Sequence, residues 1–311
     1  MDFDLSATQR SVTDALDTLL IRYAGPQRCR KLDGVEGYDH ALDAELRTGG
    51  FFDLFDEPSV GPAGAALAVE RIGAHLGTIS AAAHLLVLPA LGLEAVDGAV
   101  ALMRTADASP IRFGGEAAAV LVAGDDHAVL HPALPSGAAP SAYGFALGRI
   151  DADAAAAGGV AQAAGSAATM TDWWRVGLAA EAVGMMQSAV DIAVRYAKDR
   201  TAFRRPIGSF QALAHRLAEL SVLVTGARWL TYEAAFLGAP TEAAAAAAAH
   251  AAGAIGRVTR ETHQLMGAIG LTREHDLHLY TLRLQSLRTE LDGVAGHRRA
   301  LTAARWGGDR R

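Results

Sequence analysis

The sequence predicts a mostly helical protein, with a small β segment in its middle and an antiparallel bundle of four long helices near its C-terminal end. Apolar residues recur at helical spacing on both sides of the middle segment, whereas short apolar runs among prolines and glycines replace that spacing over 106–150. We therefore expect three parts: an N-terminal helical domain (1–105), a truncated β domain with a linker (106–168) and a C-terminal helical bundle (169–311).

The N-terminal part is predicted to consist of helices. Ser6 precedes Gln9 by three positions, a spacing typical of a capping box that opens a first helix. Four further helices are expected in this part: Asp39–Gly49, Ala63–Leu76, Ile79–Leu88 and Glu94–Met103.

The middle part carries three apolar runs of strand length with turn-like borders, at Ala117–Ala123, Ala128–Leu130 and Tyr143–Gly148. A linker rich in alanine and glycine is expected to follow at Asp151–Ala168. The segment is short, so we expect a small β domain.

The C-terminal part returns to helical periodicity. The expected long helices are Asp172–Asp199, Phe210–Leu237, Thr241–Gly267 and Glu274–Glu290, with a fifth at Val294–Arg305. Short loops between long helices favour an antiparallel bundle. The tract Ala243–Ala249 has the best intrinsic helix propensity and is flanked by charges, which favours a buried helix over a disordered tail.

Composition excludes several classes of protein. The net charge of −6 provides no basic footprint for nucleic acid. The single cysteine, Cys29, excludes a disulfide framework within the chain. The first residues are acidic and amphipathic, unlike a signal peptide. The most apolar long stretch, Ser80–Met103, is interrupted by a histidine, a proline and two acids, so we expect no membrane span and a cytoplasmic location.

The most informative segment connects two of the long helices. Pro206 and Gly208 mark a tight connection, Arg200 ends the first helix, Phe203 lies in the loop, and Gln211 opens the next helix. A guanidinium, an aromatic face and an amide in one loop suit a phosphate, a flat base and a polar ring edge. The alternative is a plain helix hairpin, in which the arginine caps the last carbonyls and the phenylalanine packs in the core.

Three blocks carry a resemblance to the acyl-CoA dehydrogenase family. Arg200–Gln211 has the form R-x-x-F-x-x-P-I-x-x-F-Q, and Leu213–Leu220 continues it. Gln264–Glu274 is similar to the family's Q-x-x-G-G-x-G-x-x-x-E, and Gly177–Gly184 is similar to the start of its first C-terminal helix. The detailed match covers residues 170–290. The resemblance implies a helical N-terminal domain, a middle β domain, a C-terminal four-helix bundle and FAD bound at a subunit interface.

The resemblance also implies roles for individual residues in FAD binding. Arg200 would contact the pyrophosphate, Phe203 would pack near the adenosine half, and Gln211 would hydrogen-bond in the same region. In this family such groups reach a flavin whose isoalloxazine ring lies in another subunit.

The second block would contact the adenosine end of the cofactor from a dimer mate, through Gln264 and the backbone around Gly267 and Ala268. Ala268 stands where the family has the second glycine of a pair. Its extra methyl group is tolerable only if the backbone φ there is negative.

The chain departs from the family at the catalytic base, a glutamate that takes the α-proton of an acyl thioester while a hydride goes to the flavin. In many members this glutamate follows the fourth helix. By count the position falls on Leu291, with Glu290 and Asp292 as neighbouring candidates. In other members it lies near the start of the first bundle helix, here at Trp174. For Asp292 the alternative is a turn residue before a glycine. The family's T-E-x-x-x-G-S-D motif, which covers the flavin ring, has no counterpart over 106–170.

Other polar residues give weaker signals. His275 and His278 lie one helical turn apart, but no third ligand has useful spacing, so we predict no metal site. His297, beside Arg298 and Arg299, is either a contact for a CoA phosphate or part of a solvated helix.

Retained FAD-adenosine contacts, a short β domain and the lack of a clear base resemble the short subunits of actinobacterial acyl-CoA dehydrogenases of steroid (cholesterol) catabolism. Such enzymes are often built as α2β2 heterotetramers, in which a full-length subunit supplies the base and the pocket for the flavin ring. The implied reaction is α,β-desaturation of a bulky, steroid-derived acyl-CoA, with electrons leaving through an electron-transfer flavoprotein. Two alternatives stay open: a self-sufficient homo-oligomer that uses Asp292 or Glu290 as its base, and a flavin-free structural or regulatory paralogue.

Overall fold

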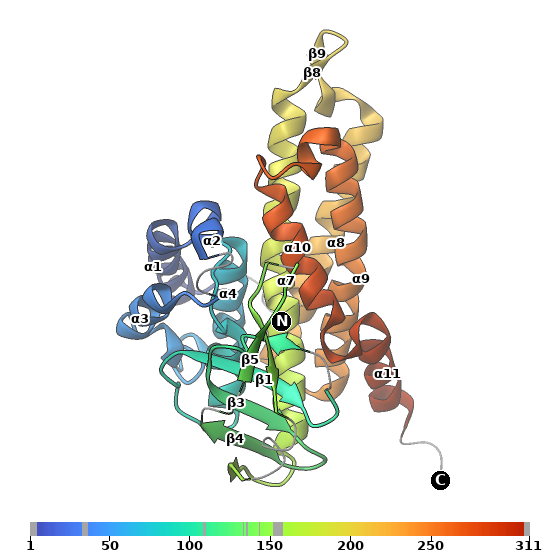
Figure 1. Ribbon diagram of the computed structural model, residues 1–311. Helices are drawn as coiled ribbons and strands as arrows, with labels where there is room; N and C mark the ends of the chain where they lie inside the picture. Colours follow the sequence, from blue (N-terminus) through green and yellow to red (C-terminus); the bar gives the residue numbers. More distant parts are fainter. Residues whose placement is uncertain are drawn as a thin grey trace.

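The computed structural model describes residues 5–32, 37–107, 110–132, 134, 136–142, 144–151 and 158–307. N-terminal helices and a small β domain lie beside the lower part of a tall helical bundle, whose upper end projects beyond them (Figure 1). The predicted fold class, mostly helical with little sheet, is confirmed.

The N-terminal helices begin with the predicted capping box. The Ser6 Oγ accepts a hydrogen bond from the Gln9 backbone N at 3.1 Å, and the Ser6 backbone N donates to Gln9 Oε1 at 3.0 Å. The helix expected at Ile79–Leu88 contains a π segment. The elements here are α1 (Ala7–Tyr23), α2 (Pro26–Leu32), α3 (His40–Thr48), η1 (Phe51–Asp53), α4 (Gly61–Ala74), the π segment η2 (Ala83–Val87) and α5 (Leu88–Ala90).

The middle part forms two small sheets. One has the strand order β1-β3-β4-β7 and the other β2-β6-β5. Two of the predicted strands match β3 and β4; the third begins later than expected, at β6, and its first residue, Tyr143, lies outside the described residues. The strands are β1 (Ala99–Arg104), β2 (Ile111–Arg112), β3 (Ala117–Ala123), β4 (Ala128–Pro132), β5 (Ser136–Ala139), β6 (Leu147–Ile150) and β7 (Val160–Ala161).

The prediction of a helix at Glu94–Met103 is wrong. Residues Ala99–Arg104 form β1, which pairs in parallel with β3, and Ala99–Met103 are buried. Alanine, leucine and methionine favour helices when isolated, but pairing in a buried sheet overrides that preference.

The C-terminal part forms the predicted bundle, and all five expected helices are confirmed. Its elements are α7 (Ser166–Asp199), the hairpin strands β8 (Thr201–Ala202) and β9 (Arg205–Pro206), η3 (Ile207–Ser209), α8 (Gln211–Phe236), α9 (Thr241–Met266), η4 (Gly267–Leu271), α10 (Leu277–Thr289), η5 (Glu290–Asp292) and α11 (Gly293–Trp306).

Helix α7 is the centre of the core and packs against the N-terminal helices, the β domain and the other bundle helices. By length and composition alone it could cross a membrane, yet 83% of its most apolar stretch is buried inside the protein, as in a core helix. The alanine tract of α9 is buried against its neighbours, as predicted.

Candidate functional site

The loop between α7 and α8 is a short hairpin at the upper end of the bundle (Figure 1). Strands β8 and β9 pair antiparallel around Phe203 and Arg204, whose φ angles are +51° and +65°. Left-handed φ at both central residues is characteristic of tight two-residue hairpin turns, and it costs about 1 kcal/mol or more for a residue other than glycine. Local strain of this kind is concentrated at functional sites. We call residues 200–211 the hairpin tip.

The hairpin tip presents its predicted side chains to solvent. The Phe203 side chain is 90% exposed, and its ring meets that of Phe210 edge-on at 6.1 Å. The Arg205 guanidinium lies 4.0 Å from the centre of the Phe210 ring. Arg200 is held by its backbone, which donates to Tyr196 O at 2.8 Å, and no ion pair within the described residues engages its guanidinium. Within the described residues, the hairpin tip therefore carries a guanidinium without an ion pair and, three positions later, a largely exposed aromatic ring.

The N-terminus of α8 adds a second feature suited to an anion. The backbone N–H groups of Leu213 and Ala214 both bond to Phe210 O, and no side chain caps the helix. The N–H groups of Gln211 and Ala212 are among the unpaired donors of the first turn. A 26-residue helix beginning beside Arg200 thus directs its positive end at this spot.

A mostly apolar groove of about 510 Å³ runs under the hairpin, between the end of α7 and the start of α8. Gly208 lets η3 approach the end of α7 closely, because a Cβ there would lie 3.1 Å from Ala197 O. The groove is lined by Val194, Ala197, Lys198, Pro206, Gly208, Ser209, Ala214 and Leu217.

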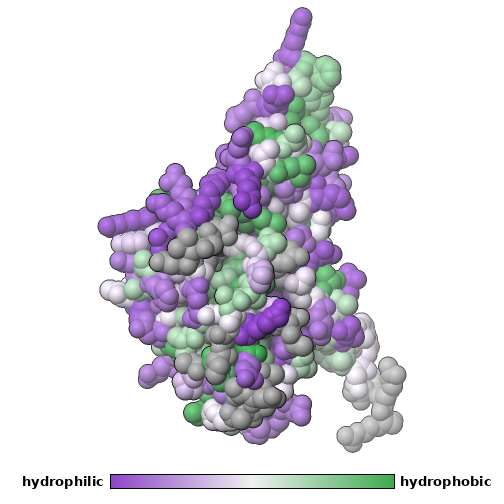
Figure 2. Space-filling model, in the orientation of Figure 1, coloured by the Kyte–Doolittle hydropathy of each residue, from purple (hydrophilic) through white to green (hydrophobic). Residues whose placement is uncertain are grey.

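The second predicted block lies at the same end of the bundle, where α9 ends and α10 begins (Figure 1). Gln264, Gly267 and Ala268 are all exposed. Gly267 has a φ of +63°, whereas Ala268 lies in a 3-10 helix and has no positive φ. The requirement that the alanine at position 268 avoid a positive φ is therefore met. Leu271, the last residue of η4, is 74% exposed. At the upper end of the molecule, green atoms lie beside a hydrophilic projection (Figure 2).

These features fit the nucleotide half of a dinucleotide. An unpartnered guanidinium and free helix N–H groups suit a pyrophosphate, while an exposed aromatic ring suits a base. No hydrogen bond among the described residues joins the hairpin tip to Gln264. Each block therefore stays available to a group outside this chain.

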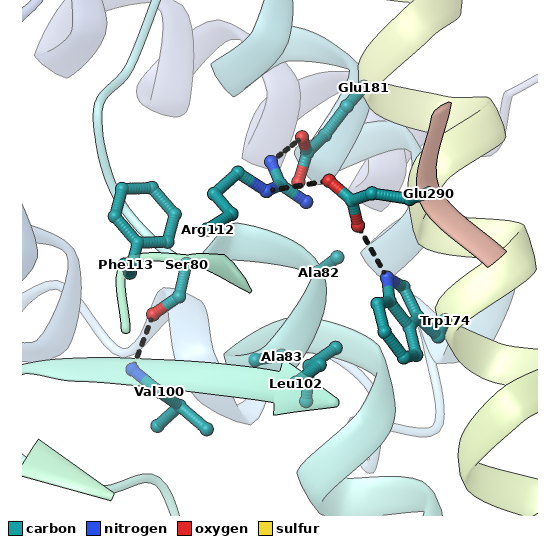
Figure 3. Close-up of a pocket in the computed structure, with 10 residues that line it drawn as sticks. All are labelled: Ser80, Ala82, Ala83, Val100, Leu102, Arg112, Phe113, Trp174, Glu181 and Glu290. Carbon is teal, nitrogen blue, oxygen red and sulfur yellow. Dashed lines mark hydrogen bonds and ion pairs between the residues drawn. The ribbon is translucent and has the colours of Figure 1, made fainter. Parts of the chain in front are cut away.

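A second site lies where the three parts of the chain meet (Figure 3). Arg112 on β2 forms ion pairs with Glu181 on α7 and with Glu290 on η5, the latter at 3.1 Å between Nε and Oε1. Trp174 Nε1 donates to the other oxygen of Glu290 at 2.9 Å. We call these four residues the buried cluster.

The buried cluster leaves almost no free space. The adjoining cavity has a volume of only about 20 Å³, and the π segment contributes Ala83 to its wall. Known ligand pockets are about 300–1,000 Å³, so this one has room for about one water molecule. Burial raises the pKa of Glu290, and the charge of Arg112 opposes that shift.

The candidate base Asp292 lies outside this cavity. Its carboxylate is 51% exposed and accepts hydrogen bonds from Arg104 at 3.0 and 3.1 Å. The Arg104 hydrogen bond lowers the pKa of Asp292. Asp292 has a φ of +62° and precedes Gly293 at the start of α11, which agrees with the turn alternative. A base needs access to its substrate's proton from inside a dry site, and this carboxylate is held at the surface.

The histidines singled out in the sequence are engaged locally or buried. His275 Nδ1 accepts a bond from the Leu277 backbone N, and His278 Nδ1 lies 2.7 Å from His275 O. Among the described residues, no group of three or more histidine, cysteine or acidic side chains could hold a metal ion. His297 is buried, and burial lowers its pKa to about 4. It therefore does not face a CoA phosphate, and the solvated-helix alternative is also wrong for this residue, since it packs inward.

Sequence reasoning missed Arg112 and Glu181 as partners of Glu290. Both were visible as charges in apolar surroundings: Glu181 interrupts the run Gly177–Gly184, and Arg112 stands in a strand of two residues. The pairing of Arg112 with Glu181 could not be inferred from the sequence, because 69 positions separate the two residues.

Comparisons with known proteins agree with this geometry. A family model described as acyl-CoA dehydrogenase, C-terminal domain, matches residues 146–306. The chain is 39% identical over 129 residues to the acyl-CoA dehydrogenase IpdE2 of Mycobacterium tuberculosis; the match covers 42% of this chain, which thereby spans about 40% of the length of that relative.

Solved structures are similar over nearly the whole chain. The crystal structure of the ChsE4–ChsE5 complex from Mycobacterium tuberculosis superimposes with a TM-score of 0.81 at 20% identity and covers 100% of both chains. A Tcur3481–Tcur3483 steroid ACAD variant gives 0.80 at 22% identity, covering 98% of this chain and 99% of the other. At these identities the likeness establishes the fold.

Proposed function

This chain belongs to the acyl-CoA dehydrogenase family, whose C-terminal-domain model matches more than half of it, and from that membership we propose that it is a short subunit completing the FAD site of a full-length partner. The partner would supply the catalytic base and the pocket for the flavin ring. This chain would supply the hairpin tip and the turn at Gln264 to the adenosine half.

The observation that carries the proposal is a contrast between two sites of one chain. The hairpin tip offers an exposed Arg200 with no ion pair among the described residues, a Phe203 that is 90% exposed, and the uncapped start of α8. The cavity between the chain's own three parts is about 20 Å³ and is filled by paired charges. A chain with exposed nucleotide contacts and a closed interior is suited to complete a cofactor site in another polypeptide.

The proposed roles follow from the chemistry of each group. Arg200 and the first N–H groups of α8 would neutralise the pyrophosphate, and Phe203 would pack against the adenosine. Gln211 and Gln264 would bond polar edges of the nucleotide. FAD held there would supply a hydride acceptor for α,β-desaturation of an acyl-CoA thioester. This chain's residues would hold the nucleotide end and exclude water from it.

The partner and substrate class rest on relatives. The similar structures are described as a complex of two proteins, ChsE4–ChsE5, and as a steroid ACAD. On that analogy we propose an α2β2 assembly, a bulky steroid-derived acyl-CoA as substrate, and an electron-transfer flavoprotein as acceptor, in the cytoplasm.

Co-expression tests the proposal. The chain is produced alone and together with a full-length acyl-CoA dehydrogenase from the same organism, and flavin absorbance is measured per mole of polypeptide. We expect no retained flavin in the lone chain and about one FAD per pair of subunits in the complex, with substrate-dependent bleaching only in the complex.

The other outcomes identify the two alternatives. Yellow, substrate-bleached protein from the lone chain would support a self-sufficient homo-oligomer that uses Glu290 or Asp292. A complex without flavin would support the structural or regulatory paralogue. Either result overturns the shared-site proposal.

A further inference from the structure

The buried cluster joins three segments that are far apart in the sequence. Arg112 comes from the β domain, Glu181 from the middle of α7, and Glu290 from the turn that follows α10 (Figure 3). Their side chains are 10%, 5% and 17% exposed. Each carboxylate meets the same guanidinium from a different structural element.

Aromatic rings enclose the guanidinium on its other sides. The Arg112 guanidinium lies 4.9 Å from the centre of the Phe145 ring and 5.6 Å from that of Phe113. On α10, the Arg283 guanidinium lies 4.6 Å from the same Phe145 ring. Arg283 also donates to Leu76 O at 3.0 Å. The loop that carries Phe145 is thus held between two arginines, and the β domain is fastened to the helices on both sides.

The charges in this enclosure do not balance. One guanidinium faces two carboxylates, and the donor from α7, the Trp174 indole, is neutral. Among the described residues, the other charged groups nearby are Asp107, which follows β1 and is itself paired with Arg104 at 2.6 Å, and Arg283, which lies against the Phe145 ring and donates to backbone carbonyls. The residues that the N-terminal helices contribute to the cavity wall carry no charge. Two ionised carboxylates would therefore leave one uncompensated negative charge away from water.

Two carboxylate oxygens without hydrogen-bond partners also indicate that the cluster holds a proton. Glu181 Oε1 and Glu290 Oε1 are both buried without a hydrogen-bond partner, although the latter lies 3.1 Å from Arg112 Nε in a geometry outside that of a hydrogen bond. A buried carboxylate in this position normally takes up a proton, because an isolated buried charge costs far more than a neutral group.

We infer that Arg112, Glu181 and Glu290 form a proton-holding lock, in which Glu290 keeps a proton beside the ion pair of Arg112 and Glu181, so that the three side chains close this chain's own cleft. The lock rests on the residues of this chain alone and goes beyond the shared FAD site. It makes the closure of the β domain onto the bundle depend on pH. Deprotonation puts a second negative charge into the enclosure and weakens the joint.

The direction of the pH effect follows from proton linkage. Burial raises the pKa of Glu290 in the folded chain above its value of about 4.3 when unfolded. The folded state therefore binds more protons than the unfolded state between those two values. Stability falls as the pH rises through this window, and it is constant above the folded pKa.

The test measures Tm against pH, from pH 4.5 to pH 9, for the purified 311-residue chain, alone or in complex with the proposed partner. Glu290→Gln keeps the acceptor for Trp174 and imitates the protonated acid. We expect the Tm of this variant to exceed that of the wild type by at least about 2 °C at high pH, with a flatter profile. Glu242→Gln, the same change at an exposed glutamate of α9, should reproduce the wild-type profile.

A Glu290→Gln profile that runs parallel to that of the wild type, at equal or lower Tm, overturns the lock. If the variant fails to fold, infrared difference spectra of the wild type between low and high pH decide the question. A protonated-carboxyl band that persists above the titration range of exposed acids supports the lock, and its absence refutes it. Neither measurement depends on bound flavin, so failure here is distinguishable from failure of the shared-site proposal.

Discussion

Trp174 donates a 2.9 Å hydrogen bond from Nε1 to Glu290 Oε2. By the family resemblance, position 174 and the segment around 290 are the two places where family members carry the catalytic glutamate. In this chain the first is an aromatic residue and the second is the counter-ion of Arg112. The two positions therefore bond to each other inside a closed cavity, and neither presents a free carboxylate.

From this geometry we expect that Glu290 is not the catalytic base of the proposed complex. We expect Glu290→Gln, in the complex with the full-length partner, to retain wild-type turnover, as should Asp292→Asn, whose carboxylate is paired with Arg104 at the surface. Loss of a true general base lowers turnover by about 10²–10⁴-fold. A loss of that size in either variant, measured by substrate-dependent reduction of an artificial electron acceptor, would restore the self-sufficient alternative.

Removing the guanidinium of the buried cluster should strongly lower the free energy of unfolding. Arg112→Met leaves two buried carboxylates without their cation, and breaking a buried pair in this way costs about 3–5 kcal/mol. The triple variant Arg112→Met, Glu181→Gln, Glu290→Gln removes all the charge and should recover most of that loss in the free energy of unfolding. Urea denaturation measures both. Equal instability of the single and triple variants would show that packing, not charge, dominates this joint.

Much of this architecture could be predicted from the sequence, because the bundle helices repeat apolar residues every three to four positions, and α8, α9 and α11 end within two residues of a glycine. The strand Ala99–Arg104 could not, since its residues favour helix and only the parallel partner β3 makes them a strand. The hairpin tip was identified from one contiguous motif. The buried cluster was not, because Arg112, Glu181 and Glu290 meet only once the three parts of the chain have packed.

Arg200 should be required for the cofactor but not for the fold. Its guanidinium is unpartnered among the described residues, so Arg200→Ala should leave the Tm of the lone chain unchanged. In the complex, loss of a charged hydrogen bond to a pyrophosphate costs about 1.5–3 kcal/mol, which weakens FAD binding about 10- to 100-fold. Arg298→Ala, at an exposed arginine of α11, is the matched control. Equal FAD affinity in both variants would contradict the proposed contact.

Phe203, like Arg200, should be required for FAD binding but not for the fold, because its ring would pack on the adenosine. With its side chain 90% exposed, Phe203→Ala should change the free energy of unfolding by less than about 0.5 kcal/mol. Stacking of an aromatic ring on a base is worth about 1–3 kcal/mol, so FAD retained after gel filtration of the complex should fall clearly. Phe236→Ala removes an exposed phenylalanine at the opposite end of α8 and should have no such effect. Loss of flavin in both variants would point to a general surface effect.

His297 should give the chain an acid sensitivity opposite in sign to that of the buried cluster. Burial, with help from the charge of Arg175, lowers its pKa to about 4, against about 6.5 when unfolded. Because the unfolded state binds more protons between these values, stability is full above pH 6.5 and is lost as the pH falls towards 4, by about 3 kcal/mol. His297→Gln should flatten this acid limb of the Tm profile, whereas His215→Gln, at an exposed histidine of α8, should not. If the Tm of His297→Gln still falls with the wild-type pH dependence, other titrating groups cause the loss of stability in acid, and the prediction for His297 is wrong.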